Sequence, residues 1–363
     1  MSAPDRILKS DYMHFAKTGS QARYNLATSG VADCTLADLD LSLHDLALHG
    51  PNPYGFPPLT EVVAERFAVD PACVVMVGGG CSFANHLALA ALVAPGDEVL
   101  VEDPTYEILQ STLGYLQARQ VPVLRRPEAR WALEPDAFAD RMSPKTRLVV
   151  LTNLHNPSSA LEDHATIQAV ADRAAGVGAQ VLVDEVYMEL MFQDGVAHTA
   201  FREDGNIIVT SSLTKAYGLS GIRCGWILAP RPLAERMRQL NNLFGSLPPH
   251  ISERMGVVAF RRLPALRDRA TARVDANRAS YRALLAEHPR LEQVVFDQGT
   301  TVFPRLLGAD VDTLFRQLTA SAETSFVPGR FFGRPEHLRI GLGGDVAMTR
   351  TGMERLATAL DAL

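Results

Sequence analysis

The sequence predicts an α/β protein, in which a mainly parallel sheet is flanked by helices and a smaller α+β domain accompanies it. Three observations lead to this prediction. Between Val74 and Leu228, short apolar runs typical of buried strands alternate with helical patterns. Polar residues repeatedly follow those runs, where ligands of open α/β sheets bind. After Pro232 the pattern changes to long amphipathic helices and then to short strands.

The length and composition fit a large core with a second lobe. The chain has 363 residues, more than one average domain, and 47% of them are hydrophobic. The change of pattern predicts a large domain at 45–235. The small domain is then discontinuous and consists of 1–44 and 236–363.

The expected elements follow in chain order. Strands are predicted at 74–77, 98–101, 121–124, 147–152, 181–183 and 206–210, and a further strand at 226–230 could run antiparallel. Helices are predicted at 83–92, 233–240, within 261–285 and at 311–320, with short strands at 293–296, 301–303 and 338–341. The arginines of 261–285 are interleaved with acidic residues, which favours a solvated helix face over a nucleic-acid surface.

Lys215 is the most informative residue, because it follows a buried-strand pattern and precedes a glycine-rich turn. A lysine whose pKa is lowered can attack a carbonyl and form a Schiff base. Ser212 and Arg223 flank it, and a hydroxyl beside a guanidinium makes a receptor for a phosphate. An aldehyde that carries a phosphate, as pyridoxal 5′-phosphate does, would suit both the lysine amine and the phosphate receptor. Taken alone, a lysine at this position is more often a solvated loop charge, and the same alternative applies to Arg223.

Asp184 and Tyr187 follow the next predicted strand. Carboxylates are seldom buried without a partner, and a protonated pyridine nitrogen is a suitable one. Tyr187 could then donate to the phenolic oxygen of the same ring. The alternative is that Asp184 only caps the following helix.

Two further turns complete the pattern. Pro157 forces Asn156 out of the helical region, so that its amide can reach the same phenolic oxygen, although a simple Asn-Pro turn is the alternative. The segment 78–82, with sequence Gly-Gly-Gly-Cys-Ser, joins a predicted strand to a predicted helix and offers backbone N–H groups to a phosphate. It matches neither GxGxxG nor GxxxxGK[ST], which disfavours a dinucleotide or a nucleoside triphosphate.

Together these residues resemble the fold-type-I aminotransferases of class I/II, which depend on pyridoxal phosphate. The resemblance spans most of the chain in the right order. The segments that carry it are Tyr54-Gly55 with Leu59, Gly80-Cys81-Ser82, Asp103-Pro104 with Tyr106, Asn153 with Asn156-Pro157, Asp184-Glu185 with Tyr187, Ser212 with Lys215, Arg223 with Gly225, and Leu338-Arg339-Ile340. The resemblance implies a large domain with a seven-stranded type of sheet, and a homodimer with shared active sites.

The resemblance also implies a role for each matched residue. Lys215 would form the Schiff base with the cofactor and later move the substrate's proton, while Asp184 would pair with the pyridine nitrogen. Asn156 and Tyr187 would bind the phenolic oxygen. The residues around the rest of the cofactor would be Tyr106 on the ring face, and the backbone of Gly80, Cys81 and Ser82 with Ser212 and Arg223 at the phosphate.

Three further positions concern the substrate and the partner subunit. Arg339 would hold the substrate α-carboxylate with two parallel hydrogen bonds, which lysine could not imitate. Tyr54 would reach the phosphate in the neighbouring subunit. Ser29 and Gly30 belong to the N-terminal segment that usually shapes the substrate pocket, and they are expected to contact substrate together with Asn156 and Arg339.

One departure from the family's pattern follows Pro157. The loop there commonly carries Thr-Gly, whereas this chain has Ser158 and Ser159. The local backbone could therefore differ, but cofactor binding should survive the change.

Charge and composition exclude several other classes. The net charge of −6 argues against nucleic acid or an anionic membrane as partner. No secretory signal or membrane-spanning stretch is visible, which favours the cytoplasm. The four cysteines and ten histidines show no metal-binding spacing, so no metal is expected. His155 is the histidine expected nearest the site, and Arg23 could read a distal acid group, although a surface ion pair is the commoner fate.

Three functions remain open. The first is an aminotransferase that acts on an L-amino acid and a 2-oxo acid. The second is β/γ-elimination or cyclisation of an amino acid with the same cofactor. The third is a non-catalytic regulator that binds the cofactor, which the full set of candidate catalytic groups disfavours.

Overall fold

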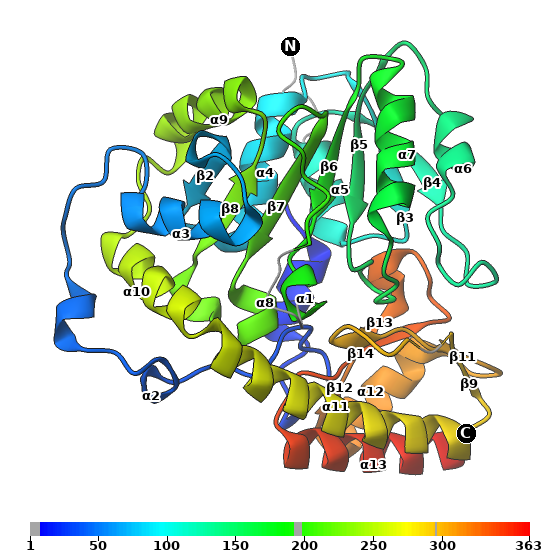
Figure 1. Ribbon diagram of the computed structural model, residues 1–363. Helices are drawn as coiled ribbons and strands as arrows, with labels where there is room; N and C mark the ends of the chain where they lie inside the picture. The colour runs from blue at the N-terminus through cyan, green and yellow to red at the C-terminus, as the bar shows by residue number, and fades with distance from the viewer. Residues whose placement is uncertain (1–7, 192–197, 295) are drawn as a thin grey trace.

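A seven-stranded sheet forms the centre of the molecule, in a computed structural model that describes residues 8–191, 198–294 and 296–363 (Figure 1). Its strands are β2 (Val74–Val77), β3 (Glu98–Asp103), β4 (Arg119–Leu124), β5 (Thr146–Thr152), β6 (Gln180–Asp184), β7 (Ile207–Ser212) and β8 (Gly225–Leu228). The order is β2-β8-β7-β6-β5-β3-β4. β8 is antiparallel to both neighbours and the other pairs are parallel, which confirms the predicted fold class.

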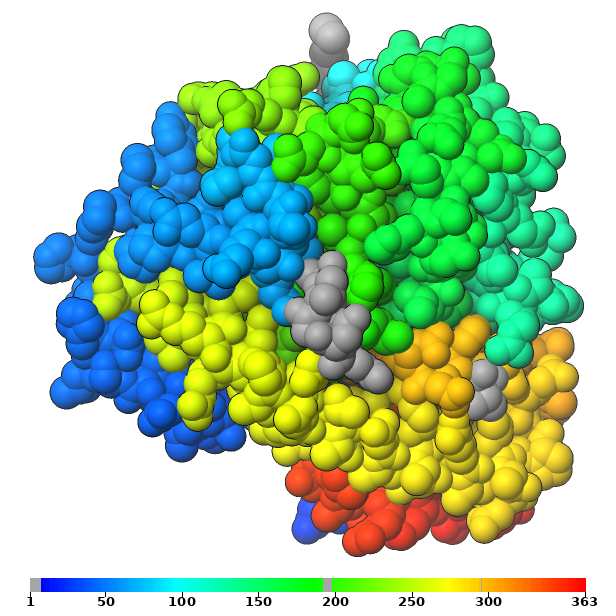
Figure 2. Space-filling model, viewed as in Figure 1, coloured from blue at the N-terminus to red at the C-terminus, as the bar shows by residue number. Residues whose placement is uncertain are grey.

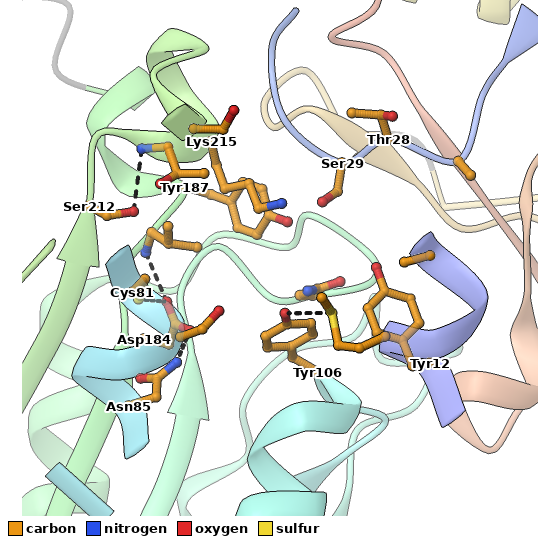
Figure 3. A pocket seen from close by; sticks show the side chains of 18 of the residues that line it. Tyr12, Thr28, Ser29, Cys81, Asn85, Tyr106, Asp184, Tyr187, Ser212 and Lys215 are labelled. Carbon is orange, nitrogen blue, oxygen red and sulfur yellow. Dashed lines mark hydrogen bonds between the residues drawn. The ribbon is translucent and has the colours of Figure 1, made fainter. Parts of the chain in front are cut away.

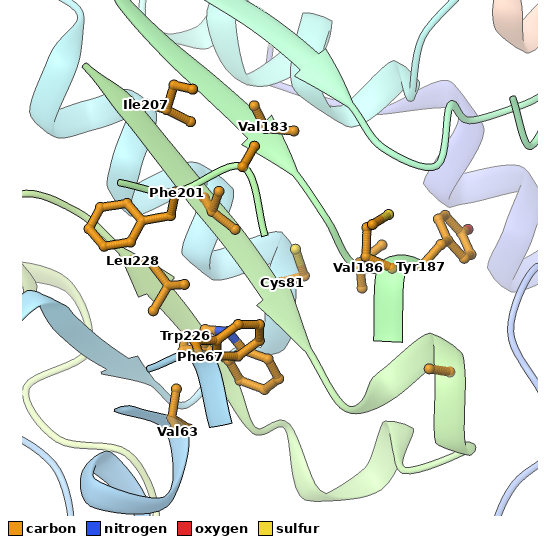
Figure 4. Close-up of a cluster of buried hydrophobic side chains, with 14 of the residues drawn as sticks. Val63, Phe67, Cys81, Val183, Val186, Tyr187, Phe201, Ile207, Trp226 and Leu228 are labelled. Carbon is orange, nitrogen blue, oxygen red and sulfur yellow. The ribbon is translucent and has the colours of Figure 1, made fainter. Parts of the chain in front are cut away.

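Helices cover both faces of this sheet. They are α3 (Pro57–Phe67), α4 (Gly80–Leu92), α5 (Glu107–Tyr115), α6 (Pro135–Ala139), α7 (His164–Ala175), α9 (Arg231–Phe244) and α10 (His250–Arg261). Because side chains alternate along a strand, Leu148 and Val150 of β5 join the core under α4, α5 and α9, while Val149 and Leu151 join the core under α3, α6, α7 and α10. Figure 4 shows part of the second core, where α3 packs against Trp226 and Leu228 of β8.

The N- and C-terminal segments form a second lobe below the sheet in Figure 1. Its elements are α1 (Asp11–Thr18), β1 (Tyr24–Asn25), α11 (Leu263–Glu287), β9 (Leu291–Glu292), β10 (Thr301–Val302), β11 (Arg305–Leu306), α12 (Val311–Ala322), β12 (Thr324–Ser325), β13 (Val327–Pro328), β14 (Leu338–Gly341) and α13 (Val346–Asp361). β1 pairs in parallel with β12, and Leu26 joins the apolar core of α11, α12 and α13. The two ends of the chain therefore fold together.

Short elements connect these parts. They are α2 (Leu36–Leu39), α8 (Thr214–Tyr217) and the 3₁₀ turns η1 (Leu43–Leu46), η2 (Pro71–Cys73), η3 (Met188–Met191), η4 (Ser220–Ile222) and η5 (Gly329–Phe332). The strand predicted at 293–296 is misplaced: β9 lies earlier, because the buried side chain of Leu291 pairs with that of Leu306. Residue 295 lies outside the described residues. The division into domains at 45 and 235 stays a prediction.

Candidate active site

A cavity of about 310 Å³ lies at the carboxyl ends of three neighbouring parallel strands. Thr152, Asp184 and Ser212 are the last residues of β5, β6 and β7, and all three line it. Such ends are where open α/β sheets bind ligands. The cavity brings together ten of the residues predicted from the sequence, namely Ser29, Cys81, Ser82, Tyr106, Asn156, Asp184, Tyr187, Ser212, Lys215 and Arg223 (Figure 3).

Lys215 lies on α8, directly after β7, and its amine points into the cavity (Figure 3). Burial, followed by the positive charges of Arg339 and Arg223, lowers the pKa of Lys215 from 10.5 to about 8. Gly30 packs against this lysine, since a Cβ at Gly30 would lie 3.2 Å from Lys215 Cδ. A substantial fraction of the amine is therefore neutral near physiological pH, which a nucleophilic lysine requires.

Asp184 lies at the opposite side of the cavity from the second lobe and is almost completely buried. Its Oδ2 accepts a hydrogen bond from Asn85 Nδ2 at 2.7 Å, and its Oδ1 accepts from the Val186 N–H at 3.0 Å and from Cys81 Sγ at 3.3 Å. Burial raises the pKa of Asp184, and these donors oppose that rise. A carboxylate held in this way suits a cationic partner in the cavity.

The N-terminus of α4 forms another wall of the cavity. Its N-cap residue, Gly79, supplies no side-chain hydrogen bond, so the first N–H groups at Cys81 and Ser82 have no side-chain cap. Gly80 does not itself line the cavity, but it adopts a φ of 65° and bonds through its N–H to the Arg223 carbonyl at 3.0 Å. Arg223 and Ser212 line the cavity beside this helix end. The group is suited to a phosphate.

Arg339 is completely buried on β14 and does not line the cavity, but it contacts three residues that do. Its guanidinium donates to Asn156 Oδ1 at 3.1 Å, to Tyr12 Oη at 2.8 Å and to the Ala27 carbonyl at 3.2 Å. The Arg339 Nε finds no acceptor among the described residues. The predicted substrate clamp thus lies one side chain behind the cavity wall.

Two of the tyrosines predicted from the sequence border the cavity. Burial raises the pKa of Tyr187, with the Ser29 hydroxyl as a hydrogen-bond partner, so its phenol stays protonated and can donate. Tyr106 is the N-cap residue of α5, and its hydroxyl lies 3.8 Å from Met13 Sδ. Burial also raises the pKa of Tyr106. Both phenols can therefore act as neutral donors.

Tyr54 lies apart from the cavity and is 45% exposed. Its hydroxyl accepts a hydrogen bond from Gln239 Nε2 at 3.2 Å. The loop that carries it is held by Glu253, which accepts bonds from the Asn52 amide and from the Phe56 N–H. Its predicted contact with a neighbouring subunit stays a prediction.

Sequence reasoning missed several residues that shape the site. Tyr12 and Met13 reach the cavity from α1, and Asn85 reaches it from the second turn of α4. Sequence reasoning also gave Cys81 only a backbone role, whereas its thiol contacts Asp184. Only Asn85 left a signal, since it is a polar residue within the apolar helix 83–92.

The loop after Pro157 keeps an unusual backbone despite its serines. Ser159 adopts a φ of 68°, in the left-handed region that favours glycine, and its hydroxyl donates to the Thr301 carbonyl at 2.8 Å. His155 is buried and does not line the cavity, because its ring bonds Ser158 and the Pro104 carbonyl. Arg23 forms a surface ion pair with Glu323.

Within the described parts of the chain, no three His, Cys, Asp or Glu side chains are grouped to hold a metal ion. No helix in those parts is long and apolar enough to cross a membrane.

Comparison with known proteins identifies the class. The family model described as aminotransferase class I and II matches residues 31–360. Capreomycidine synthase of Streptomyces vinaceus is 33% identical over 88% of this chain and 85% of its own, and arginine–pyruvate transaminase AruH of Pseudomonas aeruginosa is 29% identical over 82% and 79%.

Solved structures show the same fold. A PLP-dependent aminotransferase from Streptococcus suis superposes with a TM-score of 0.89 at 22% identity, covering 100% of this chain and 99% of its own. The PLP-dependent cyclase OrfR superposes with a TM-score of 0.84 at 23% identity, covering 99% of both chains.

The chain belongs to the class I and II aminotransferase family, and it is an enzyme whose cofactor is pyridoxal 5′-phosphate. The cavity fits that cofactor. The helix end at Cys81 and Ser82, with Arg223 and Ser212, suits the phosphate, the amine of Lys215 suits the aldehyde, and buried Asp184 suits the pyridine nitrogen.

Proposed function

We propose that the protein is an aminotransferase that moves an amino group between an L-amino acid and a 2-oxo acid, with Lys215 as the residue that binds the cofactor covalently. The observation that carries the proposal is the position of the Lys215 amine, whose pKa is lowered to about 8, in one cavity with buried Asp184. Pyridoxal phosphate supplies an aldehyde that condenses with amines and a ring that withdraws electrons.

Individual side chains of the cavity would transfer the proton, balance the charge and donate hydrogen bonds. Lys215 Nζ, once free, accepts the proton from the substrate α-carbon and returns it, because its pKa allows both states near neutral pH. Asp184 supplies the negative charge that keeps a ring nitrogen protonated. Tyr187 donates its O–H, since its raised pKa keeps the phenol neutral, and Asn156 presents its amide beside it.

Arg339 is proposed to bind the substrate α-carboxylate. Its Nε and one of its two NH₂ groups could turn toward a carboxylate if Tyr12 or Asn156 gives way, and a guanidinium binds such a group with two parallel hydrogen bonds. Ser29 borders the same space, while Gly30 is proposed to act through its packing on Lys215.

Absorbance spectroscopy of the purified protein in the near-ultraviolet and visible range tests the proposal. We expect a visible band that shifts to the near-ultraviolet pyridoxamine band on addition of L-amino acids and returns with a 2-oxo acid. Lys215→Ala should lose the visible band while keeping the fold, whereas the exposed Lys145→Ala should match wild type. No visible band after addition of the cofactor to wild type, or normal turnover by Lys215→Ala, would overturn the proposal.

Cyclisation or elimination of an amino acid is a second candidate. The name capreomycidine synthase and the cyclase title of OrfR favour it, because neither of these two similar proteins is named as a transaminase. The same spectra separate the two reactions. A substrate that is consumed without any pyridoxamine band, and without need of a 2-oxo acid, would establish the second candidate.

A homodimer with shared active sites is also proposed, with Tyr54 and residues 241–252 at the interface. It is supported by exposed large apolar side chains around the loop that carries Tyr54 and along the end of α9, which are Leu43, Leu48, Leu243, Phe244 and Leu247. Figure 2 shows the blue segment before Tyr54 projecting at the edge of the molecule beside α10. Size-exclusion chromatography with light scattering should give a dimer; a stable and active monomer would contradict it.

We expect the enzyme to act on small molecules in the cytoplasm, without a nucleic-acid or membrane partner. Its net charge of −6 supports the expectation, because nucleic acids and anionic membranes attract basic surfaces.

A further inference from the structure

A chain of three buried side chains stands behind the cavity at Asp184. Asn85 on α4 is 1% exposed and donates to Asp184 Oδ2, and Thr210 on β7 is fully buried and donates to Asn85 Oδ1 at 2.5 Å. Thr210 lies directly opposite Asp184 in the pairing of β6 with β7. Asn85 and Asp184 line the cavity, whereas Thr210 does not, so the chain runs from the sheet interior to the site.

The orientation of the Asn85 amide is set by Asp184 and supported by the Thr210 hydroxyl. An asparagine amide has a donor end and an acceptor end of similar shape, and its surroundings determine which end faces which neighbour. An ionised Asp184 can only accept, so it takes the NH₂ end of Asn85, and Asn85 Oδ1 then accepts from the Thr210 hydroxyl. Without that hydroxyl the buried Oδ1 would lose its donor, and the amide would be held less firmly against Asp184.

We propose that Asn85 and Thr210 form a positioning pair, which holds Asp184 ionised and oriented into the cavity so that it keeps the ring nitrogen of the cofactor protonated. The proposal rests on the role of Asp184 in the proposed function. Neither member of the pair was recognised in the sequence, and Thr210 acts without touching the cavity.

The electrostatic surroundings show why such a pair is needed. Burial is the largest influence on Asp184 and raises its pKa, while the hydrogen bond from Asn85 is the largest influence that lowers it. The Cys81 thiol gives less help, since it is a weak donor at 3.3 Å. The titratable groups around Asp184 are the Cys81 thiol on α4, the Lys215 amine on α8, and Tyr106, Glu185 and Tyr187.

Thr210→Val tests the pair, because valine has the shape of threonine without the hydroxyl. The first readout uses the protein freed of cofactor, in which ¹³C NMR follows the titration of the Asp184 carboxyl group. We expect the midpoint to rise by up to about one pH unit in Thr210→Val, because an amide that is no longer held by Thr210 donates less well to the buried carboxylate. Thr210→Ser keeps the hydroxyl and should bring the midpoint back toward wild type.

The second readout uses the holoenzyme with cofactor labelled with ¹⁵N in its ring. Because its ionised form is less stabilised, Asp184 should draw the proton that it shares with the ring nitrogen toward itself, so Thr210→Val should move the ¹⁵N resonance toward that of an unprotonated ring and release cofactor about tenfold faster. Thr349→Val removes an equally buried hydroxyl on α13 and should change neither value. Asn85→Leu should change both readouts in the same direction as Thr210→Val. It replaces Thr210→Val in the experiment if that variant does not fold.

The outcomes separate this inference from the proposed function. Equal Asp184 midpoints in Thr210→Val, Thr210→Ser and wild type would overturn the positioning pair and leave the proposed function intact. An unprotonated ring nitrogen in wild-type holoenzyme near neutral pH would overturn the role of Asp184 itself, and with it the inference.

Discussion

Lys215 should show its lowered pKa in the rate at which the protein takes up its cofactor. Only the neutral amine attacks an aldehyde, so the rate of covalent attachment should rise with pH, pass its midpoint at about 8 and then level off. Stopped-flow absorbance after mixing the cofactor-free protein with pyridoxal phosphate measures this. A midpoint near the ordinary lysine value of 10.5 would show that burial and the two arginines do not act on the amine as described.

Arg339→Lys tests the carboxylate clamp. Lysine keeps the charge but loses the paired donors, so we expect kcat/KM for an amino-acid substrate to fall about 10- to 100-fold. The matched comparison is the amine that lacks the α-carboxylate, whose already slow reaction with the cofactor should change little. Equal losses for both compounds would show that Arg339 supports the fold or the cofactor and does not select the substrate.

Single residues differed in how far the sequence could predict them. Asp184 directly ends an apolar run, and Lys215 and Asn156 follow such runs within a few residues. Tyr12 could not be found in this way, since it lies on a short amphipathic helix. Its contact with Arg339 of β14 forms only in the folded protein. Thr210 was hidden because threonine is an ordinary strand residue, and its role depends on a helix 125 positions away.

At the scale of single elements, Gly225 controls how closely β8 approaches the start of α4. A Cβ at Gly225 would lie 2.6 Å from the carbonyl carbon of Gly80, which is backbone and cannot turn away. Gly225→Ala should therefore displace the helix end and weaken binding of pyridoxal phosphate at least about tenfold. Fluorescence titration measures the affinity. Gly221→Ala is the control, since nothing lies within 4 Å of its Cβ; equal affinities of the two variants would contradict the argument.

Arg125 ties the ends of three strands together. It follows β4, donates to Glu102 of β3 at 2.7 Å and also pairs with Glu162, while Glu102 accepts the N–H and the hydroxyl of Thr152 at the end of β5. Burial raises the pKa of both carboxyl groups, and Arg125 opposes the rise. Thr152 in turn accepts a hydrogen bond from the Asn156 N–H, so this cluster supports the site.

Arg125→Met should leave two carboxyl groups buried without their cation. We expect a loss of about 3–5 kcal/mol in the free energy of unfolding, measured by urea denaturation. The control is Arg173→Met, which removes a surface ion pair with Asp136 and should cost less than about 1 kcal/mol. Similar losses for the two variants would show that the buried cluster contributes little to stability.

The strands of the sheet domain were predictable because buried parallel strands leave apolar runs, whereas only α4 and α9 among the helices that cover the sheet were predicted individually. The elements of the second lobe were less predictable. Its strands are two to four residues long, which is too short for a pattern, and β9 was misplaced for that reason. The left-handed backbone at Ser159 also left no signal, since serine does not mark such a position as glycine would.

At the scale of the whole molecule, the proposed sharing of Tyr54 predicts complementation between two impaired variants. Lys215→Ala and Tyr54→Phe are expected to be inactive and weakened, respectively. In a mixed dimer one site would combine an intact Lys215 with an intact Tyr54, so refolding the two together should restore up to about a quarter of wild-type activity by random pairing. No recovery above the Tyr54→Phe dimer alone would contradict the shared site.

Two parts of the chain line the cavity, and their residues have different proposed roles. The groups that suit the cofactor, Asp184, Ser212 and Lys215, come from the sheet, whereas Tyr12, Met13 and Ser29 come from the N-terminal segment that folds onto the second lobe. The groups that suit the cofactor and the residues proposed to meet the rest of the substrate therefore lie in separate segments of the chain. Divergence of the short first segment alone could give this scaffold a new substrate while its chemistry stays untouched.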